Sequence, residues 1–224
     1  MKYKVVIFDL FETLITEWGH KKYTKNEMCA DLGVERTEFD IYWDEKEQDR
    51  YIGSMSFEDS ILYVSEKCKK TVDTTTISNI IDRRIKTKSV CFEHVHTEVF
   101  PLLSSLRNMG LRTAIISNCS SEEVKVLKES EIYKYFDEVV LSYEVHMKKP
   151  DSCIYEETSK RLSVDSGECV FVGDGGSNEL VGAKKVRMKA IQAKWYTNLH
   201  LRKRENINGF LVAEEPMDII KYLE

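Results

Sequence analysis

The sequence of 224 residues has little of what marks membrane, fibrous or disulfide-stabilised proteins. It holds 3 prolines and 10 glycines, and its 6 cysteines form no C-x-x-C pair. No apolar run approaches the roughly 20 residues of a membrane span, and the N-terminus does not resemble a signal peptide. We therefore expect a soluble cytoplasmic protein with reduced thiols, and we exclude disorder, collagen and coiled coil.

Neither sign of charge is in large excess. The 33 basic and 38 acidic residues give a net charge of −5, which repels nucleic acid and anionic membranes. The basic cluster at residues 202–204 is therefore interpreted as a solvated surface. We expect a small-molecule substrate and neither nucleic acid nor membrane as a partner, while the oligomeric state is undetermined.

Short β-branched runs separated by helical patterns indicate the fold. Each run is followed by a polar residue or a glycine-rich turn, as in strands buried on both faces of a parallel sheet. A helical pattern starts at Val99, and Ser121 is typical of a helix start. The fold class predicted is α/β, a Rossmann-like parallel sheet with helices on both faces. The predicted strands are residues 4–9, 111–117, 138–141, 169–173 and, more weakly, 189–193.

One interval has no convincing strand and indicates an inserted α-helical cap subdomain. Its Ser56 begins a capping box, and the threonines at 74–76 are expected to cap its last helix. The sequence therefore predicts a core formed by residues 1–15 and 96–224 and a helical cap formed by residues 16–95. The helices expected in the cap are residues 23–32, 36–50, 56–69 and 74–87.

Polar side chains follow the predicted strands. In a parallel sheet these strand ends meet in one crevice, so three carboxylates and a lysine are expected to face one another. Carboxylates this close repel unless a cation is bound, and an all-oxygen set favours Mg²⁺. The residues concerned are Asp9, Ser117, Asn118, Lys149, Asp174 and Glu179.

Four motifs in order resemble the haloacid dehalogenase-like hydrolases, whose members are mostly Mg²⁺-dependent phosphatases with an inserted cap. They are FDLFETL at 8–14, IISN at 115–118, KKPD at 148–151 and GDGGSNE at 173–179. The resemblance implies that Asp9 is a nucleophile forming a covalent aspartyl intermediate. It also implies that Lys149 neutralises the transferring group, and that Ser117 and Asn118 hold a phosphoryl oxygen.

The same resemblance implies the ligands of the metal ion. Asp9 and Asp174 would bind Mg²⁺ through their side chains, and Phe11 would bind it through its backbone carbonyl. Glu179 stands where the family usually has Asp, and it would bind the ion directly or through water.

Phe11 departs from the phosphatase pattern. Family phosphatases carry at this position a second Asp, which protonates the leaving group, and a phenyl ring cannot do this. Loss of that help costs roughly 10²- to 10⁴-fold in rate, so weakly basic leaving groups would suffer least. Glu12, where many relatives have Gly, is one hypothetical replacement acid.

An aromatic residue at position 11 also resembles the 2-haloacid dehalogenases, whose halide leaves without a proton. Those enzymes work without metal and have Ser where this chain has Asp174. Phosphoryl transfer from a small phosphorylated substrate therefore ranks first, and reaction with a halogenated substrate ranks second. A weakly active or inactive protein that binds a ligand or a protein partner is the third alternative.

Three further residues leave alternatives open. His94 and His96 could form a metal pair, but surface histidines are the better interpretation because no third ligand is near in sequence. Arg50 could reach a substrate anion from the cap or pair with neighbouring acids, so we leave it out of the predicted site.

Overall fold

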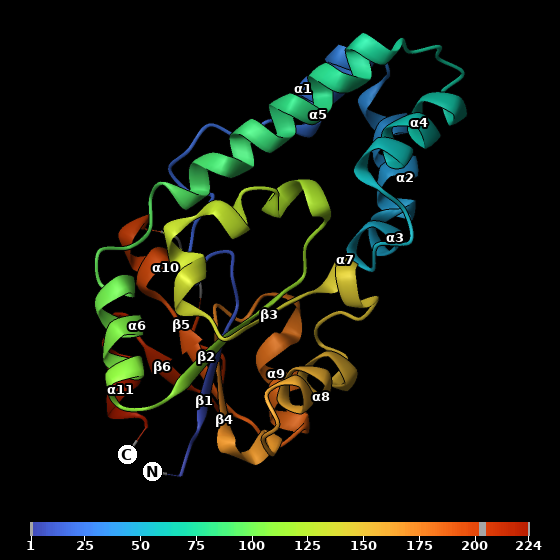
Figure 1. Cartoon of the computed structure of the whole chain (residues 1–224). Coiled ribbons are helices and arrows are strands. Elements are labelled where there is room, and N and C mark those ends of the chain that lie inside the picture. The colour runs from blue at the N-terminus through green and yellow to red at the C-terminus, as the bar shows by residue number, and fades with distance from the viewer. Residues whose placement is uncertain (1, 202–204, 224) are drawn as a thin grey trace.

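A parallel sheet lies at the centre of the computed structural model, which describes residues 2–201 and 205–223 (Figure 1). The strand order is β3-β2-β1-β4-β5-β6. The five predicted strands are confirmed, and the edge strand β6 was missed because three residues carry no recognisable pattern. The strands are β1 Val5–Phe8, β2 Arg112–Ser117, β3 Glu138–Leu141, β4 Cys169–Gly173, β5 Lys189–Ala193 and β6 Leu211–Ala213.

Helices cover both faces of the sheet, as the buried strands require. Val6 and Phe8 of β1 belong to the apolar cluster that includes the buried face of α6, whereas Val5 and Ile7 belong to the cluster with α8 and α9. The core is therefore a three-layer α/β structure. Its helices are α6 Val99–Asn108, α7 Ser142–Val145, α8 Ser152–Arg161, α9 Glu179–Lys185, α10 Trp195–Leu199 and α11 Asp218–Lys221.

The helices between β1 and α6 pack around a third apolar cluster of their own. We call residues 16–95 the helical segment. The capping box at Ser56 is confirmed, but Asp73, and not a threonine, caps the last helix by accepting the N–H of Thr76. The predicted helix 36–50 is divided at Lys46. The helices are α1 Lys25–Leu32, α2 Arg36–Glu45, α3 Glu47–Tyr51, α4 Phe57–Lys67 and α5 Thr74–Ser89.

The stretch after β2 differs from the prediction. Ser120 forms a capping box with Glu123, but an α-helix does not follow. Three short 3-10 turns stand there, at Ser121–Val124, Leu127–Glu129 and Glu131–Tyr135. The predicted cap, Ser121, is therefore one residue late, because Ser120 is the cap, and the predicted α-helix is wrong.

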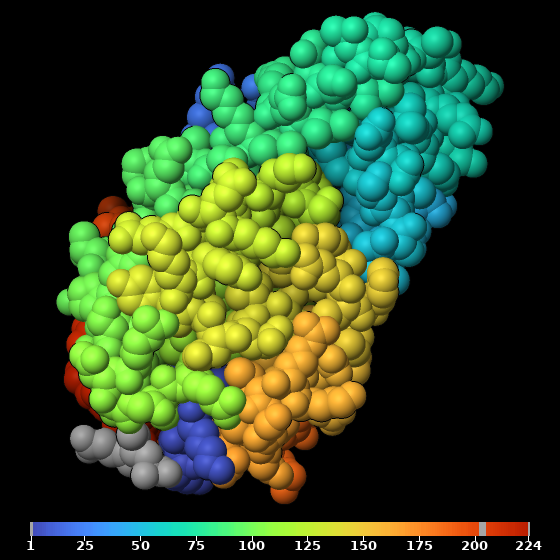
Figure 2. Space-filling model, in the orientation of Figure 1, coloured from blue at the N-terminus to red at the C-terminus, as the bar shows by residue number. Residues whose placement is uncertain are grey.

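The helical segment lies beyond the carboxyl ends of the strands (Figure 1). The face drawn in Figure 2 shows it packed against the loops that follow β2 and β3. There α5 contacts the 3-10 turn at Ser121–Val124, and α3 contacts α7. Among the described residues, no helix combines the length and apolar character needed to cross a bilayer.

Candidate active site

Asp9 lies directly after β1, in the middle of the sheet. Phe8 pairs with Ile115 of β2 and with Val172 of β4, and the N–H of Asp9 donates to the Val172 carbonyl over 2.8 Å. The Asp9 side chain is buried, and the hydroxyl of Thr13 lies 3.4 Å from its Oδ2. The sheet therefore fixes this carboxylate at the end of a central strand.

Lys149 lies between two carboxylates. Its Nζ is 2.5 Å from Oδ1 of Asp9 and 2.5 Å from Oε2 of Glu179. Burial by itself would lower the pKa of Lys149, but the charges of these two carboxylates outweigh it and raise the pKa. The side-chain amide of Asn118 exchanges two hydrogen bonds, each of 2.8 Å, with the backbone N–H and carbonyl of Lys149. The residue after β2 thus positions a lysine that remains protonated.

Three buried carboxylates converge beside this lysine. Asp9, Asp174 and Glu179 each place one oxygen within 4.8 Å of the others. Burial, and then the charge of Asp9, raise the pKa of Glu179 to about 7. Oδ1 of Asp174 accepts the N–H of Gly176 at 2.8 Å, and Oε1 of Glu179 accepts the N–H of Gly175 at 3.0 Å. This mutually repelling, oxygen-only set fits Mg²⁺, which would relieve the repulsion.

The glycines of the loop after β4 are required by close packing. A Cβ on Gly173 would lie 2.2 Å from Oε1 of Glu179. Gly175 has φ 95°, and a Cβ there would lie 2.2 Å from the Cδ1 of Ile207. The fully buried Gln192 holds Ile207 in place by accepting its N–H over 2.8 Å. The glycines therefore let the loop bring Glu179 close to the strand end.

Ser117 and Asn118 follow β2 on the same edge. The Ser117 hydroxyl is buried and, among the described residues, has no hydrogen-bond partner, which leaves it able to donate to an oxygen of a ligand. The side chain of Asn118 is engaged by the backbone of Lys149. Their predicted role, and that of the Phe11 carbonyl, stay predictions.

Glu12 occupies a left-handed backbone conformation, with φ 60°. Its carboxylate accepts the hydroxyl of Thr16 and, at 3.0 Å, the N–H of Glu17, and burial raises its pKa. Positive φ is unfavourable for a side chain with a Cβ, which explains why Gly suits this position. Both carboxylate oxygens of Glu12 therefore stabilise the loop that leads into the helical segment.

Two residues of α10 that sequence reasoning missed fix the loop after β1. The indole Nε1 of Trp195 donates to the Thr13 carbonyl over 2.8 Å, and the Tyr196 hydroxyl donates to the Leu14 carbonyl over 3.0 Å. Thr13 lies within the first motif, so the sequence could have indicated that its loop adjoins the site. No local signal connects α10 with a loop 182 residues earlier in the chain.

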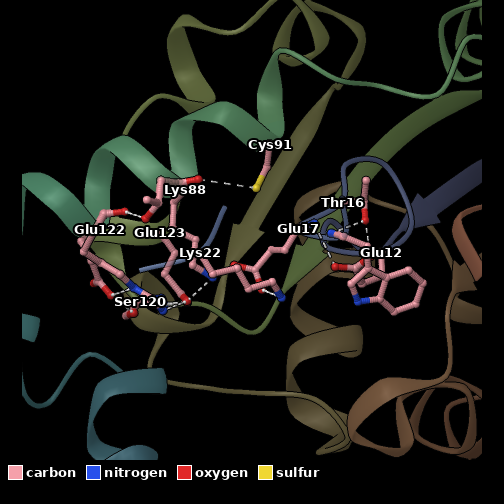
Figure 3. Close-up of polar contacts among 12 residues, drawn as sticks. Glu12, Thr16, Glu17, Lys22, Lys88, Cys91, Ser120, Glu122 and Glu123 are labelled. Atoms are coloured by element: carbon pink, nitrogen blue, oxygen red, sulfur yellow. Dashed lines mark hydrogen bonds and ion pairs between the residues drawn. The ribbon is translucent and has the colours of Figure 1, made fainter. Parts of the chain in front are cut away.

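A second buried ion-pair network joins the helical segment to the loop after β2 (Figure 3). Nζ of Lys88 lies 2.5 Å from Glu17 and 2.7 Å from Glu123, and Nη2 of Arg84 lies 2.6 Å from Glu123. Burial alone would raise the pKa of Glu123, but the charges of Lys88 and Arg84 hold it at about 2. Lys88 also stands 4.7 Å from the centre of the Phe11 ring, so this network adjoins the candidate site.

The histidines considered as a metal pair have different neighbours. The exposed His94 stacks on His20 with ring centres 4.5 Å apart, while the half-buried His96 packs edge-on against Tyr196 at 5.9 Å. Within 2–201 and 205–223, the carboxylates of the candidate site are the one group of three or more potential ligands that converge. The basic cluster at 202–204 lies outside the described residues.

Comparisons with known proteins agree with this geometry. Residues 3–187 match the family model of the haloacid dehalogenase-like hydrolases. A glyceraldehyde 3-phosphate phosphatase from Methanopyrus kandleri is 29% identical over 57% of this chain and 57% of its own. An (S)-2-haloacid dehalogenase from a Pseudomonas species is 25% identical over 75% of this chain and 73% of its own. The chain spans about half the length of the curated phosphatases that it matches.

Solved structures share the fold. The L-2-haloacid dehalogenase RSc1362 superposes with a TM-score of 0.63 at 16% identity, over 100% of this chain and 99% of its own. A family enzyme from Bacteroides thetaiotaomicron, complexed with magnesium and inorganic phosphate, superposes with a TM-score of 0.62 at 18% identity, over 86% of this chain and 94% of its own. With most of its length matched by the family model, the chain belongs to the haloacid dehalogenase-like hydrolases.

Proposed function

We propose that this protein is a Mg²⁺-dependent phosphatase that hydrolyses a small phosphorylated metabolite through an aspartyl-phosphate on Asp9. The observation that carries the proposal is the convergence of Asp9, Asp174 and Glu179 beside Lys149 at the strand ends. Bound Mg²⁺ would be held by these carboxylates and the Phe11 carbonyl, and it would offset the negative charge of the phosphoryl group.

The residues of the chain divide the reaction into two displacements. An oxygen of Asp9 attacks phosphorus, the bond to the leaving oxygen breaks, and the leaving group departs as an anion or takes a proton from water. Water then attacks the phosphorus of the aspartyl-phosphate, which releases inorganic phosphate and restores Asp9. Lys149 and the Ser117 hydroxyl balance the charge on the phosphoryl oxygens during both steps.

Phe11 restricts the substrates of this reaction. Its ring cannot protonate an alkoxide, and the carboxylate of Glu12 is engaged by Thr16 and Glu17. Acyl, enol or aryl phosphates, whose leaving groups are stable anions, are therefore the preferred substrate classes.

A 2-haloacid dehalogenase is the second candidate, and Phe11 is the feature that favours it. The same Asp9 would attack carbon and expel halide, which needs no acid. The three carboxylates argue against it, because without a cation they would repel the carboxylate of a haloacid.

Residues 16–95 are proposed to act as a cap that excludes water from the crevice, above a core of residues 1–15 and 96–224. Residues 23–81 contribute an apolar cluster of their own, which supports a separate cap, while Trp18, Cys91, Phe92 and Val95 at the two ends of the segment pack with the core cluster. The six cysteines are all free thiols, in keeping with the proposed cytoplasmic location.

The test is a release assay with two readouts. Acetyl phosphate, p-nitrophenyl phosphate and glyceraldehyde 3-phosphate are incubated with the protein and Mg²⁺, and 2-chloropropionate is incubated with and without EDTA. Asp9→Asn serves as the control. We expect phosphate release that requires Asp9 and stops in EDTA. Halide release that persists in EDTA would assign the dehalogenase, and release no greater than that of Asp9→Asn would indicate a binding protein.

A further inference from the structure

Arg50 of α3 is a buried cation without an acidic partner. Its side chain is 6% exposed, yet among the described residues it makes no ion pair and no side-chain hydrogen bond, and Nη1 is buried without a partner. The guanidinium lies 3.9 Å from the centre of the Trp43 ring. A buried charge is normally paired, so these free N–H groups indicate a missing anion.

Arg83 shows what a paired arginine looks like in the same helical segment. Its guanidinium also lies over an aromatic ring, that of Tyr23, at 4.2 Å. Unlike Arg50, it is ion-paired with both Glu27 and Asp31, and it is well exposed. The aromatic contact is therefore common to both arginines, and the missing acid is specific to Arg50.

The acids around Arg50 are too far away to serve as partners. Burial lowers its pKa, and the charges of Glu47, Glu122 and Asp44 only partly oppose this effect. Glu122 lies on the core loop after β2, and its nearest cation is Arg84, at 3.9 Å. Oε2 of Glu122 also lacks a hydrogen-bond partner among the described residues. Buried polar atoms without a hydrogen-bond partner among the described residues thus occur both in the helical segment, at Arg50, and in the core loop, at Glu122.

α3 is held against the part of the chain that carries Lys149. His146 Nδ1 is 2.7 Å from the Ile52 carbonyl, and Lys148 contacts Gln48. A Cβ on Gly53 would lie 2.0 Å from the Tyr143 carbonyl, so only glycine permits this approach. α3, which carries Arg50, therefore lies against the segment that joins β3 to Lys149.

We propose that Arg50 binds a second anionic group of the substrate, a carboxylate or a second phosphate, remote from the phosphoryl group that Asp9 attacks. The inference rests on the proposed phosphatase function and narrows its substrates to doubly anionic metabolites. Stacking on Trp43 orients the guanidinium, whose N–H fork suits the paired oxygens of a carboxylate or phosphate.

The experiment compares substrates that differ only at the far end. Values of kcat/KM are measured for aryl phosphates, the class that the site should hydrolyse without an acid: 4-carboxyphenyl phosphate against phenyl phosphate, and 1,4-phenylene bisphosphate against 4-hydroxyphenyl phosphate. The proteins are the unmodified chain, Arg50→Met, Arg50→Lys and, as matched control, Arg83→Met. In at least one of the two pairs, Arg50→Met should lower the ratio of kcat/KM for the doubly anionic substrate to kcat/KM for its singly anionic analogue. We expect a decrease on the order of tenfold to a hundredfold, mainly through a higher KM. Arg50→Lys should retain part of this preference. Arg83→Met should leave the preference unchanged.

A binding measurement separates this inference from the proposed function. In the Asp9→Asn background with Mg²⁺, 4-carboxyphenyl phosphate or 1,4-phenylene bisphosphate should raise the melting temperature, and adding Arg50→Met should abolish the rise. That result supports the inference even if no substrate is hydrolysed. An equal rise in both proteins, or a substrate preference unchanged by Arg50→Met, overturns it even if the protein proves to be a phosphatase.

Discussion

Two lysines of this protein are each buried between two carboxylates, and they differ in what surrounds the pair. Lys149 lies 2.5 Å from Asp9 and from Glu179, and Lys88 lies 2.5 Å from Glu17 and 2.7 Å from Glu123. In both cases the acids raise the lysine pKa despite burial, which alone would lower it. Distance and burial therefore do not tell the two sites apart.

The arrangement of the acids does. Around Lys149, oxygens of three carboxylates converge within 4.8 Å of one another, an oxygen-only set of the kind that binds Mg²⁺. Around Lys88, the acids are matched by cations. These are Glu17, Glu122 and Glu123 against Lys22, Arg84 and Lys88. Converging carboxylates indicate a metal site, whereas acids that are matched by cations hold two parts of the chain together.

The largest expected effect separates the lysines by activity. Lys149→Met removes the cation beside Asp9, so kcat for acetyl phosphate should fall on the order of 10³-fold. Steady-state phosphate release measures kcat. Lys88→Met, tested alongside, should lower kcat by less than about 10²-fold. Equal losses in both variants would contradict the distinction.

Removal of Lys88 should be seen in stability. Lys88→Met leaves Glu17 and Glu123 buried without their cation, which should lower the free energy of unfolding by about 3 kcal/mol. Urea denaturation measures this change. In a double-mutant cycle, Glu123→Gln should cost less in the Lys88→Met background than in the unmodified chain, and additive effects would mean that the pair is not coupled.

Acid should release the balanced network. The pKa of Glu123 is about 2 in the folded protein and 4.5 ordinarily, so its stabilisation is complete above pH 4.5 and is lost as the pH falls toward 2. The contribution is about 3 kcal/mol. The stability difference between the unmodified chain and Glu123→Gln should therefore shrink on acidification.

Glu122 provides the control with the opposite sign. Burial and the charge of Glu123 raise its pKa, so ionised Glu122 opposes folding near neutral pH. Glu122→Gln should stabilise the protein at pH 7, and this gain should fade in acid. A pH-independent difference for both variants would refute the assignment.

Phe11 touches both clusters, because its ring packs against Lys88 and its carbonyl belongs to the proposed metal site. Phe11→Asp supplies a proton donor, so kcat for an alkyl phosphate such as glycerol 1-phosphate should rise by at least about tenfold. Phe11→Asn, which has similar size but no transferable proton, is the matched control. A rise in both variants would exclude proton transfer as the cause.

The smallest effect tests the converging carboxylates as a metal site. Mg²⁺ at ten times its dissociation constant should stabilise the protein by about 1.4 kcal/mol, or about 4 °C in melting temperature for a chain of this size. Asp174→Asn should abolish the increase, whereas Glu123→Gln should retain it. An increase of the same size in Asp174→Asn would place the ion elsewhere.

Patterns within short windows were sufficient for much of the fold. β-Branched runs located β1 to β5, and Ser56 located the start of α4. They failed for β6, a three-residue edge strand, and for the stretch after Ser121, where a capping signal is followed by 3-10 turns. Such short elements depend on their neighbours more than on their own sequence, so no local pattern announces them.

By itself the sequence determined the alternation of strand and helix, the polar residue after each strand and hence the convergence of Asp9, Lys149 and Asp174, because parallel strands end at one edge. Only the tertiary structure decided that Asn118 holds the backbone of Lys149, that Lys88 pairs with Glu123, and that Arg50 is buried with no ion pair to any acid in the described part of the chain. Whether a charge is paired depends on side chains far apart in the chain, and a linear pattern does not encode their distance.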